Sequence, residues 1–166
     1  MKKYLLLLSL SLFSCQVDYH ELTESEIISC KQNVYENGDE ECYKDLILSY
    51  GVNYESAELF PLTYLMASKY NNGYACRHLY ESIIKINNSY KVENDKGEFQ
   101  NNLILKLNKA DKEFALYYLM KGSRLNDFNC ISNLSKLYEN GWVVLKDQKK
   151  ADSLNNLNSI NLGVAQ

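Results

Sequence analysis

Two segments of this chain repeat one phrase at a distance of 54 residues. Residues 64–76 read YLMASKYNNGYAC and residues 118–130 read YLMKGSRLNDFNC. Both open with Tyr, Leu and Met, and both have Asn ninth, an aromatic residue eleventh and Cys thirteenth. Self-similarity of this kind indicates a repeat architecture, in which each unit buries its apolar face against a neighbouring unit. The repetition therefore predicts a stack of similar units.

The apolar spacing predicts that each unit is a pair of helices. Only one Pro and seven Gly occur in the chain, which disfavours a turn-rich β-sandwich. After a candidate N-cap at Asp111, apolar side chains recur at helical spacing. The residues on this face are Phe114, Tyr117, Tyr118 and Leu125. We therefore expect a helix here.

Two further helices are predicted after it. The apolar face of the first contains Ile131, Leu134, Leu137 and Tyr138. Gly141 stands where a helix ends in a left-handed residue, and Asp147 is the expected N-cap of the second helix. The residues expected to face inward from that helix are Ala151, Leu154 and Leu157.

The first half of the chain has the same helical character. The expected helices lie near 23–33, 41–50, 59–70 and 74–86. Pro61 falls in the first turn of the third, where proline is tolerated. Residues 87–98 are polar and predict a loop. The segment FQNNLILKLN that follows fits either a helix or a strand, and we expect a helix. An insertion near 87–110 would explain a spacing longer than the roughly 34 to 45 residues of helical repeats.

The second copy, extended to residues 115–151, has a recognisable pattern. Its first helix carries Ala115, Tyr117–Tyr118 and Gly122, and its second carries Cys130, Leu134 and Tyr138. Gly141, Val144, Asp147 and Lys150–Ala151 follow. This pattern resembles the Sel-one-like repeat, a relative of the tetratricopeptide repeat, although Asn126–Asp127 and Trp142–Val143 depart from it. The matching residues of the first copy are Tyr64, Gly73, Cys76, Tyr80 and Ile84, and residues 49–57 look like the tail of an earlier unit.

The resemblance implies an all-α fold for residues 23–166, a short right-handed α-solenoid of stacked helix–turn–helix repeats. In this family the two Cys positions hold small residues that allow close helix packing, and the first helices of the units line the concave side. Such repeats bind proteins, so the resemblance also implies a binding module.

The N-terminus predicts a lipoprotein. Residues 1–14 have the basic start, short apolar run and small residue of a secretory signal peptide. The apolar run is too short to span a bilayer. The ending LFSC resembles a bacterial lipobox, which implies cleavage before Cys15, lipidation of that Cys and a tether over residues 15–22. The alternative is an ordinary secretory signal with a chance Cys. Because Gln16 follows Cys15, we expect the periplasmic face of the outer membrane, its inner leaflet, as the site of attachment.

Four further cysteines are disulfide candidates in such an oxidising compartment. They are Cys30, Cys42, Cys76 and Cys130. Four cysteines allow three connectivities. A Cys30–Cys42 bridge is the most plausible, because both residues flank the turn YENGDEE. Cys76 and Cys130 could pair with each other or stay as small buried side chains.

Nothing in the sequence points to catalysis, a metal or a cofactor. There is no CxxC motif and no Gly-rich phosphate loop. His20 lies in the predicted tether, and His78 is expected to be partly exposed on a helix. The acidic turn at 38–41 is expected to be solvated. The predicted mature chain has 16 basic and 21 acidic residues without a basic patch, which argues against nucleic acid as a partner.

Two groups of aromatic and basic residues are distinguished by their expected exposure. The Tyr residues expected in the core are Tyr64, Tyr80, Tyr117, Tyr118 and Tyr138. The candidates for partner binding are Tyr70, Tyr74, Lys121, Arg124, Phe128 and Trp142. By helical phase, Lys121 and Arg124 should be exposed. Specificity is expected where the two copies differ, at 69–70 against 123–124 and in the turns NNGY and NDFN.

These features together predict a binding protein that has no chemistry of its own. The first hypothesis is a periplasmic, lipid-anchored immunity protein that binds and neutralises a toxic effector of a type VI secretion system, such as a phospholipase. The alternative is an envelope scaffold or assembly lipoprotein. The membrane would be contacted through the N-terminal lipid only.

The lipobox resemblance makes the first testable prediction. Intact-mass spectrometry of the protein from bacterial membranes should show a chain that begins at Cys15 and carries lipid on it. Cys15→Ser should remove the lipid mass and release the protein from the membrane fraction. A mature N-terminus elsewhere, or an unmodified Cys15 in the membrane-bound protein, would contradict the prediction.

Overall fold

The computed structural model describes residues 22–50, 59–88 and 99–161, and these residues form an all-α fold. The helices in chain order are α1 (Glu24–Asn37), α2 (Glu40–Ser49), α3 (Leu59–Ser68), α4 (Gly73–Asn88), the 3-10 helix η1 (Asn101–Lys106), α5 (Lys109–Arg124), α6 (Phe128–Asn140) and α7 (Gln148–Asn161). The expected tail of an earlier unit at 49–57, the signal peptide and the tether lie mostly or wholly outside the described residues.

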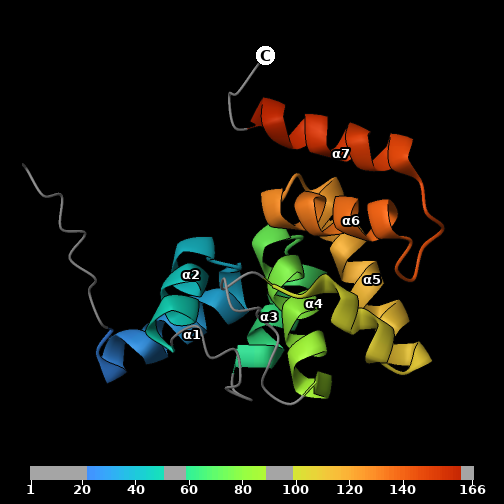
Figure 1. Ribbon diagram of the computed structural model, residues 1–166. Helices are drawn as coiled ribbons and strands as arrows, with labels where there is room; N and C mark the ends of the chain where they lie inside the picture. Colours follow the sequence, from blue (N-terminus) through green and yellow to red (C-terminus); the bar gives the residue numbers. More distant parts are fainter. Residues whose placement is uncertain (1–21, 51–58, 89–98, 162–166) are drawn as a thin grey trace, which may run out of the picture.

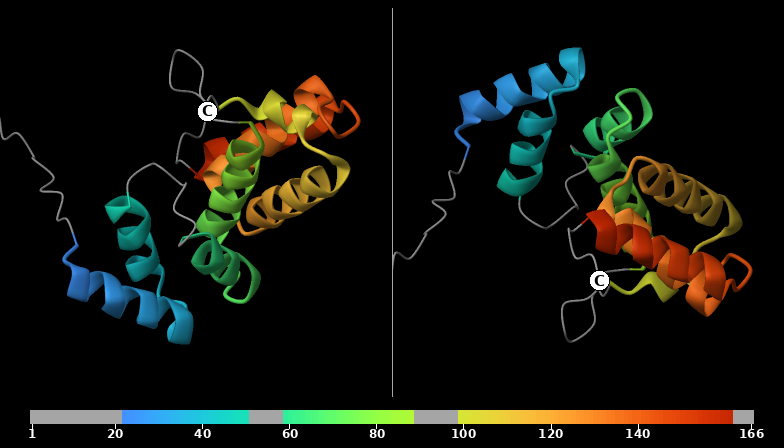
Figure 2. Two further views of the ribbon diagram at one scale, coloured as in Figure 1. Left: turned by 90° about the horizontal axis from the view of Figure 1, so that it is seen from below. Right: turned by 90° about the horizontal axis from the view of Figure 1, so that it is seen from above.

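The helices pack as successive pairs that follow the chain across the molecule (Figure 1). Helix α1 packs against α2, α3 against α4 and α5 against α6, while α7 covers α6. Helix α4 also contacts α5, which joins the second pair to the third. The two further views show the α1–α2 pair at one end of this row (Figure 2). The predicted all-α arrangement of stacked helix–turn–helix pairs is thus confirmed.

Capping residues explain where the helices begin and end. Thr23 and Glu26 form a capping box at α1, and Gly38 ends that helix with a φ of +68°. Gly141 ends α6 in the same left-handed conformation, as predicted. The predicted cap at Asp111 is wrong. Helix α5 begins at Lys109, because the side chain of Asn108 accepts a hydrogen bond from the Asp111 backbone N–H.

The other predicted bounds need smaller corrections. Helix α1 continues to Asn37, four residues beyond the predicted end, and α4 continues to Asn88. Helix α3 ends at Ser68 instead of residue 70. In the predicted insertion, the segment expected to be a helix contains η1, a single short 3-10 helix. Residues 89–98, expected to be a loop, lie outside the described residues.

Helix α5 packs very closely at Gly122 against the N-terminal ends of α4 and α6. A Cβ built on Gly122 would overlap the sulfur of Cys130 and lie 2.9 Å from Cβ of Cys76. Both thiols are free and fully buried. The two cysteines that close the repeated phrase therefore meet at one glycine. They are small packing residues of the core.

Buried hydrogen bonds link the pairs to one another. The Tyr43 hydroxyl on α2 donates to Thr63 Oγ1 on α3 over 3.1 Å. The Tyr80 hydroxyl on α4 donates to Asn101 Oδ1 over 2.7 Å, and Asn101 Nδ2 donates to Asn133 Oδ1 on α6 over 3.0 Å. The two bonds of Asn101 fix η1 against α4 and α6. Breaking one of them would leave a buried polar group without its partner.

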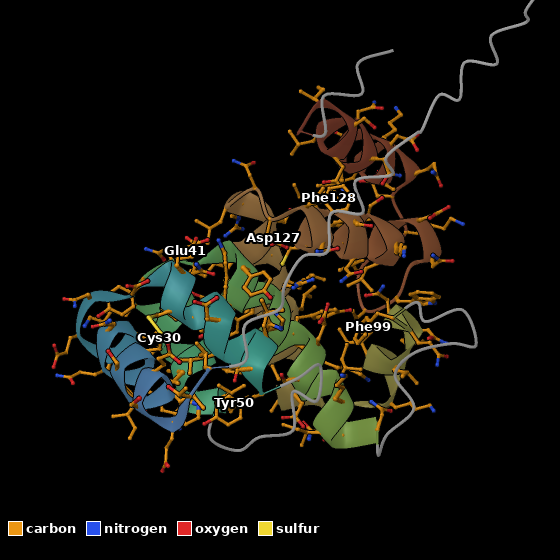
Figure 3. All side chains as sticks on the ribbon, turned by 90° about the vertical axis from the view of Figure 1, so that its left-hand side faces the viewer. Cys30, Glu41, Tyr50, Phe99, Asp127 and Phe128 are labelled. Carbon is orange, nitrogen blue, oxygen red and sulfur yellow. A yellow bond between two sulfur atoms is a disulfide. The ribbon has the colours of Figure 1, made fainter. Side chains whose placement is uncertain are left out.

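The disulfide between Cys30 and Cys42 is present, as predicted (Figure 3). It crosslinks α1 to α2 with Cα atoms 4.9 Å apart. This bridge lies in the pair at the end of the row, where fewer neighbours hold the helices together than in the middle.

Three residues expected to face inward are exposed. Tyr64 and Tyr117 lie on the outer faces of α3 and α5, and Leu157 lies on the outer face of α7. The other expected core tyrosines, Tyr80, Tyr118 and Tyr138, are buried as predicted. The periodicity predicts helices α3 and α5 correctly, but their buried faces are narrower than predicted.

The contact at Gly122 predicts an unusual response to alanine. Gly→Ala in a helix interior normally stabilises by roughly 0.5–1 kcal/mol. Gly122→Ala should instead destabilise the protein by about 1–3 kcal/mol, because the new methyl group overpacks the junction. Urea unfolding measures this, and adding Cys130→Ala should restore part of the loss by removing the clashing sulfur. A more stable Gly122→Ala protein would contradict this packing.

Candidate functional site

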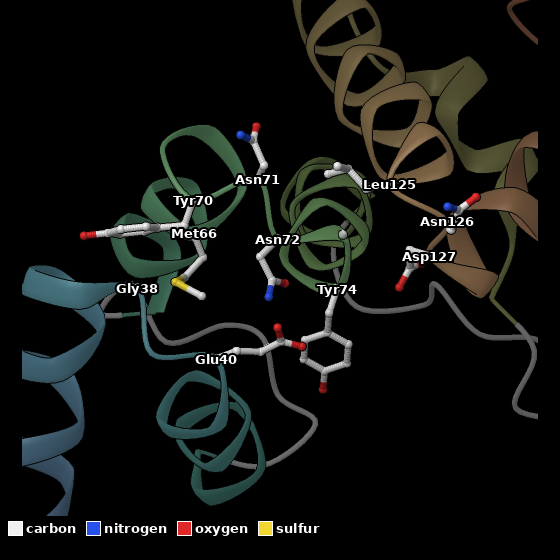
Figure 4. Close-up of a pocket in the computed structure, with 11 residues that line it drawn as sticks. Gly38, Glu40, Met66, Tyr70, Asn71, Asn72, Tyr74, Leu125, Asn126 and Asp127 are labelled. Carbon is white, nitrogen blue, oxygen red and sulfur yellow. The ribbon is translucent and has the colours of Figure 1, made fainter.

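The turns within the first three helix pairs surround a polar pocket, which we call the turn pocket (Figure 4). Its volume is about 380 Å³. The lining residues come from the α1–α2 turn (Gly38, Glu40), the end of α3 and the α3–α4 turn (Met66, Tyr70, Asn71, Asn72, Gly73), the start of α4 (Tyr74) and the α5–α6 turn (Leu125, Asn126, Asp127). The two turns NNGY and NDFN, where the copies of the phrase differ, thus lie at the same pocket.

Helix caps hold the polar groups of this turn pocket in place. Asn72 Oδ1 accepts a hydrogen bond from the Ala75 backbone N–H over 2.8 Å at the start of α4. Asp127 Oδ1 accepts from the Cys130 backbone N–H over 2.8 Å at the start of α6. These equivalent caps fix both side chains at the N-terminal ends of α4 and α6.

Tyr70 and Tyr74, two of the predicted partner-binding residues, line the turn pocket. The Tyr70 hydroxyl donates to the backbone oxygens of Tyr35 and Glu36, each over 3.0 Å. A Cβ on Gly38 would overlap the Tyr70 ring, so only glycine permits this contact. Both observations place Tyr70 in the joint between the first two pairs.

Tyr74 belongs to an aromatic and basic cluster behind the pocket. Its ring centroid lies 4.2 Å from that of His78 and 6.0 Å from that of Tyr43. The Arg77 guanidinium lies 4.6 Å from the Tyr74 ring centroid. Burial raises the pKa of the Tyr74 hydroxyl, and the nearby Arg77 opposes this rise. Tyr74 remains half-buried, with part of its ring at the pocket.

Arg124 and Phe128 flank the α5–α6 turn that lines the pocket, and both are exposed. Figure 3 shows Asp127 and Phe128 at the start of α6. Trp142 lies elsewhere, half-buried in the loop after α6, and it packs against the core. Four of the six predicted partner-binding residues therefore lie at or beside the turn pocket, and Trp142 does not.

Lys121 corrects the expectation of an exposed lysine. Its Nζ donates to the backbone oxygens of Ala67 over 2.6 Å and Ser68 over 3.3 Å, at the C-terminal end of α3. A cation at this end satisfies free helix carbonyls and interacts favourably with the helix dipole. Lys121 is thus half-buried and ties α5 to α3.

Sequence reasoning missed an aromatic surface that spans α3 and α5. It consists of Tyr64, Phe114, Tyr117 and Tyr118, and we call it the aromatic face. The ring of Tyr64 stacks on Phe114 with centroids 6.4 Å apart, and Tyr118 makes edge contacts with Phe114 and Tyr117 at 5.0 Å. Tyr64, Phe114 and Tyr117 are 45%, 37% and 57% exposed, whereas Tyr118 is only 3% exposed. The signal was present in the phrase, since Tyr64 and Tyr118 occupy its equivalent first positions.

No protein-family model matches this chain, and neither does any curated protein or solved structure compared with it. The resemblance to the Sel-one-like repeat therefore stays a prediction, while the stacked helix pairs rest on the structure.

The described residues contain no helix that is both long and apolar enough to cross a membrane. Over the same ranges, His, Cys, Asp and Glu side chains form no group of three that could hold a metal ion. Burial raises the pKa of the Cys76 thiol to about 11 and raises that of Cys130 as well. Both thiols are protonated at neutral pH and are weak nucleophiles.

His78 is buried, with 1% of its surface exposed, instead of lying partly exposed as expected. Arg77 Nη2 lies 3.0 Å from His78 Nε2. Burial, helped by the positive charges of Arg77 and Lys85, lowers the pKa of His78 to about 2. The imidazole is therefore neutral in the folded protein at physiological pH.

This burial predicts a pH dependence of stability. Below pH 6.5 the unfolded chain protonates His78 and the folded chain does not, so acidification favours unfolding by up to about 1.4 kcal/mol per pH unit. Urea unfolding at several pH values from 6.5 to 4.5 should show a shallower loss of stability for His78→Gln than for the wild type. All other groups are common to the two proteins, so the comparison isolates His78. Parallel profiles for the two proteins would contradict the buried, neutral imidazole.

Proposed function

We propose that this chain is a lipid-anchored protein-binding module of the periplasm, and that it acts as an immunity protein. Its partner would be a toxic effector of a type VI secretion system, such as a phospholipase. The observation that carries the proposal is the exposed aromatic face on α3 and α5. The N-terminal sequence supports attachment to the membrane through Cys15.

The composition of the aromatic face favours protein binding. Tyr and Phe are enriched at protein interfaces, where a few aromatic residues carry most of the binding energy. Three partly exposed rings come from two separate helices: Tyr64 lies beside Phe114, and Tyr117 contacts Tyr118. Each exposes apolar area that a partner could cover. Each Tyr also has a hydroxyl that can stay hydrated or form a hydrogen bond at the rim of an interface.

The aromatic face is held in shape before any partner arrives. Tyr118 lies beneath the exposed rings and supports them with edge contacts. Its burial, with the nearby Tyr64, raises the pKa of its hydroxyl to about 12, so it stays neutral. The Lys121 bonds to α3 fix the helices that carry the rings. A preformed surface loses less conformational entropy on binding, which favours tight binding.

Neutralisation would proceed by occlusion. The aromatic face would cover the part of the effector that approaches the membrane, and the lipid on Cys15 would keep the module where the effector acts. Such a mechanism requires a binding surface that fits the effector, apolar area to bury against it, and attachment to the membrane where the effector acts. It needs no catalytic group in this chain.

The proposal predicts loss of protection when the aromatic face is removed. A strain that lacks this gene should be killed by contact with its own secreting sister cells, and the wild-type gene should restore survival. Tyr64→Ala with Tyr117→Ala should restore at least tenfold less survival, as expected when hot-spot residues worth about 2 kcal/mol or more are truncated. Tyr35→Ala is the matched control, because Tyr35 is equally exposed at 51% but lies on α1.

Two results would contradict the proposal. A deletion strain that survives sister contact unharmed would exclude the immunity role, and envelope defects in that strain would favour the scaffold alternative. Full protection by the double variant, with normal protein levels, would exclude the aromatic face as the binding surface.

A further inference from the structure

We propose that a groove between η1, the start of α5 and the α6–α7 loop docks on the surface of an anionic phospholipid bilayer. The groove has a volume of about 460 Å³. We call it the lysine groove, and its lining residues are Leu105, Lys109, Lys112, Glu113, Leu116 and Val143. The inference goes beyond the proposed function, because the sequence predicts contact with the membrane through the N-terminal lipid only.

Exposed aliphatic side chains stand at both edges of the lysine groove. Leu105 of η1 is 48% exposed, and Leu145 of the α6–α7 loop is 91% exposed. Leu116 and Val143 between them are half-buried. A leucine on an exposed loop gains nothing from the fold of its own chain, but it can insert at the boundary between lipid headgroups and acyl chains.

The backbone of the α6–α7 loop is held in a conformation that its sequence disfavours. Val143 has a φ of +55°, in the left-handed region that β-branched residues avoid. Backbone outliers of this kind cluster at functional sites, because the surrounding structure must maintain them. Trp142 and Val143 are also the residues at which this loop departs from the Sel-one-like pattern. Membrane docking would explain both departures.

Lysines supply positive charge around this apolar surface. Lys112 is half-buried in the groove and has no ion-pair partner among the described residues. Lys109 contacts only Glu113, over 3.9 Å between two strongly exposed side chains. Lys106 and Lys146 are exposed next to Leu105 and Leu145.

The helix dipole adds to this charge. Lys109 and Lys112 lie in the first turns of α5, where the N-terminal end of the helix already has positive partial charge. An anionic phosphate would compensate the lysines and the dipole together. Charge complementarity therefore favours an anionic surface as the occupant of the groove.

The composition of the groove favours lipid over protein. Lysine is depleted at protein interfaces, and leucine and valine are under-represented among their hot spots. Lysines beside exposed aliphatic residues are typical of segments that bind anionic membrane surfaces. The aromatic face, made of Tyr and Phe, has the opposite character. The two surfaces are therefore suited to different partners.

The two surfaces can be occupied at the same time. Lys109, Lys112 and Leu116 follow one another at helical spacing along one side of α5, whereas Phe114 and Tyr117 lie on another side. The α6–α7 loop and the start of α5 lie at the end of the molecule away from the α1–α2 pair (Figure 2). Docking there would leave the aromatic face free for an effector.

Trp142 provides a direct probe, because it is the only tryptophan of the chain and precedes Val143. The mature chain with Cys15→Ser is titrated with vesicles of equimolar phosphatidylglycerol and phosphatidylcholine, whose acyl chains are brominated and quench nearby tryptophan. Trp142 fluorescence should fall saturably with lipid concentration and recover when salt is added. Vesicles of brominated phosphatidylcholine alone should quench little. Sixteen basic and 21 acidic residues give the mature chain a charge of −5, so net charge alone predicts the opposite preference.

Variants at exposed positions separate docking from folding. Lys109→Gln with Lys112→Gln should weaken vesicle binding about tenfold or more, because each lysine near an anionic surface contributes to binding. Leu145→Ser should weaken it as well by removing the inserting side chain. Lys69→Gln with Arg124→Gln is the matched control, which removes two exposed charges near the opposite end of α5 and should leave binding nearly unchanged. Trp142 emission without vesicles should be the same in all variants.

Three results would overturn the inference: no saturable quenching, equal quenching by both kinds of vesicle, or equal weakening by the control pair. Quenching by a dissolved brominated fatty acid but not by vesicles would also overturn it, and would assign the groove to a single acyl chain. These outcomes are distinct from a failure of the proposed function, because no effector is present. Vesicle docking by a protein whose deletion strain survives sister contact would keep the lysine groove and exclude the immunity role.

Discussion

Three helices approach one another closely at Gly122, and this contact determines how the second helix pair stacks on the third. Cys76 of α4 and Cys130 of α6 both pack against this glycine, so α5 lies deep between the two second helices of neighbouring pairs. The absence of a side chain at Gly122 is what allows the second pair to stack on the third. The residues of the repeated phrase therefore serve helix packing. Its Cys residues are the small side chains that the stack requires.

The position of α5 then determines both candidate binding surfaces. Along one side of α5, Lys121 reaches the carbonyls that end α3, and the rings of Phe114 and Tyr118 are brought beside Tyr64. At its C-terminal end, the turn to α6 comes to lie beside the turn of the preceding pair and closes the turn pocket. Two surfaces of different chemistry, one aromatic and one polar, thus arise from one stacking geometry.

Local patterns predicted the elements well apart from the Asp111 cap and some helix ends, and tertiary contacts account for the other errors. Short-range signals, such as the Gly141 cap and the Cys30–Cys42 bridge across one turn, depend on neighbours in sequence and were correct. The exposure of Tyr64, the burial of His78 and the use of Lys121 as a cap depend on which helix lies opposite, and periodicity carries no such information. The sequence predicts that the turns NNGY and NDFN carry specificity, but it does not predict that they line one pocket. Its shape follows from the meeting of three turns far apart in sequence.

Helices α3 and α5 present one preformed aromatic surface in the free protein. Nuclear Overhauser effects between the ring protons of Tyr64 and those of Phe114 and Tyr118 measure this most directly, because these residues lie about fifty positions apart in the chain. Clear cross-peaks between these rings are expected with no partner present. Cross-peaks from the Tyr64 ring to residues of its own helix alone would contradict the stacked arrangement and the surface built on it.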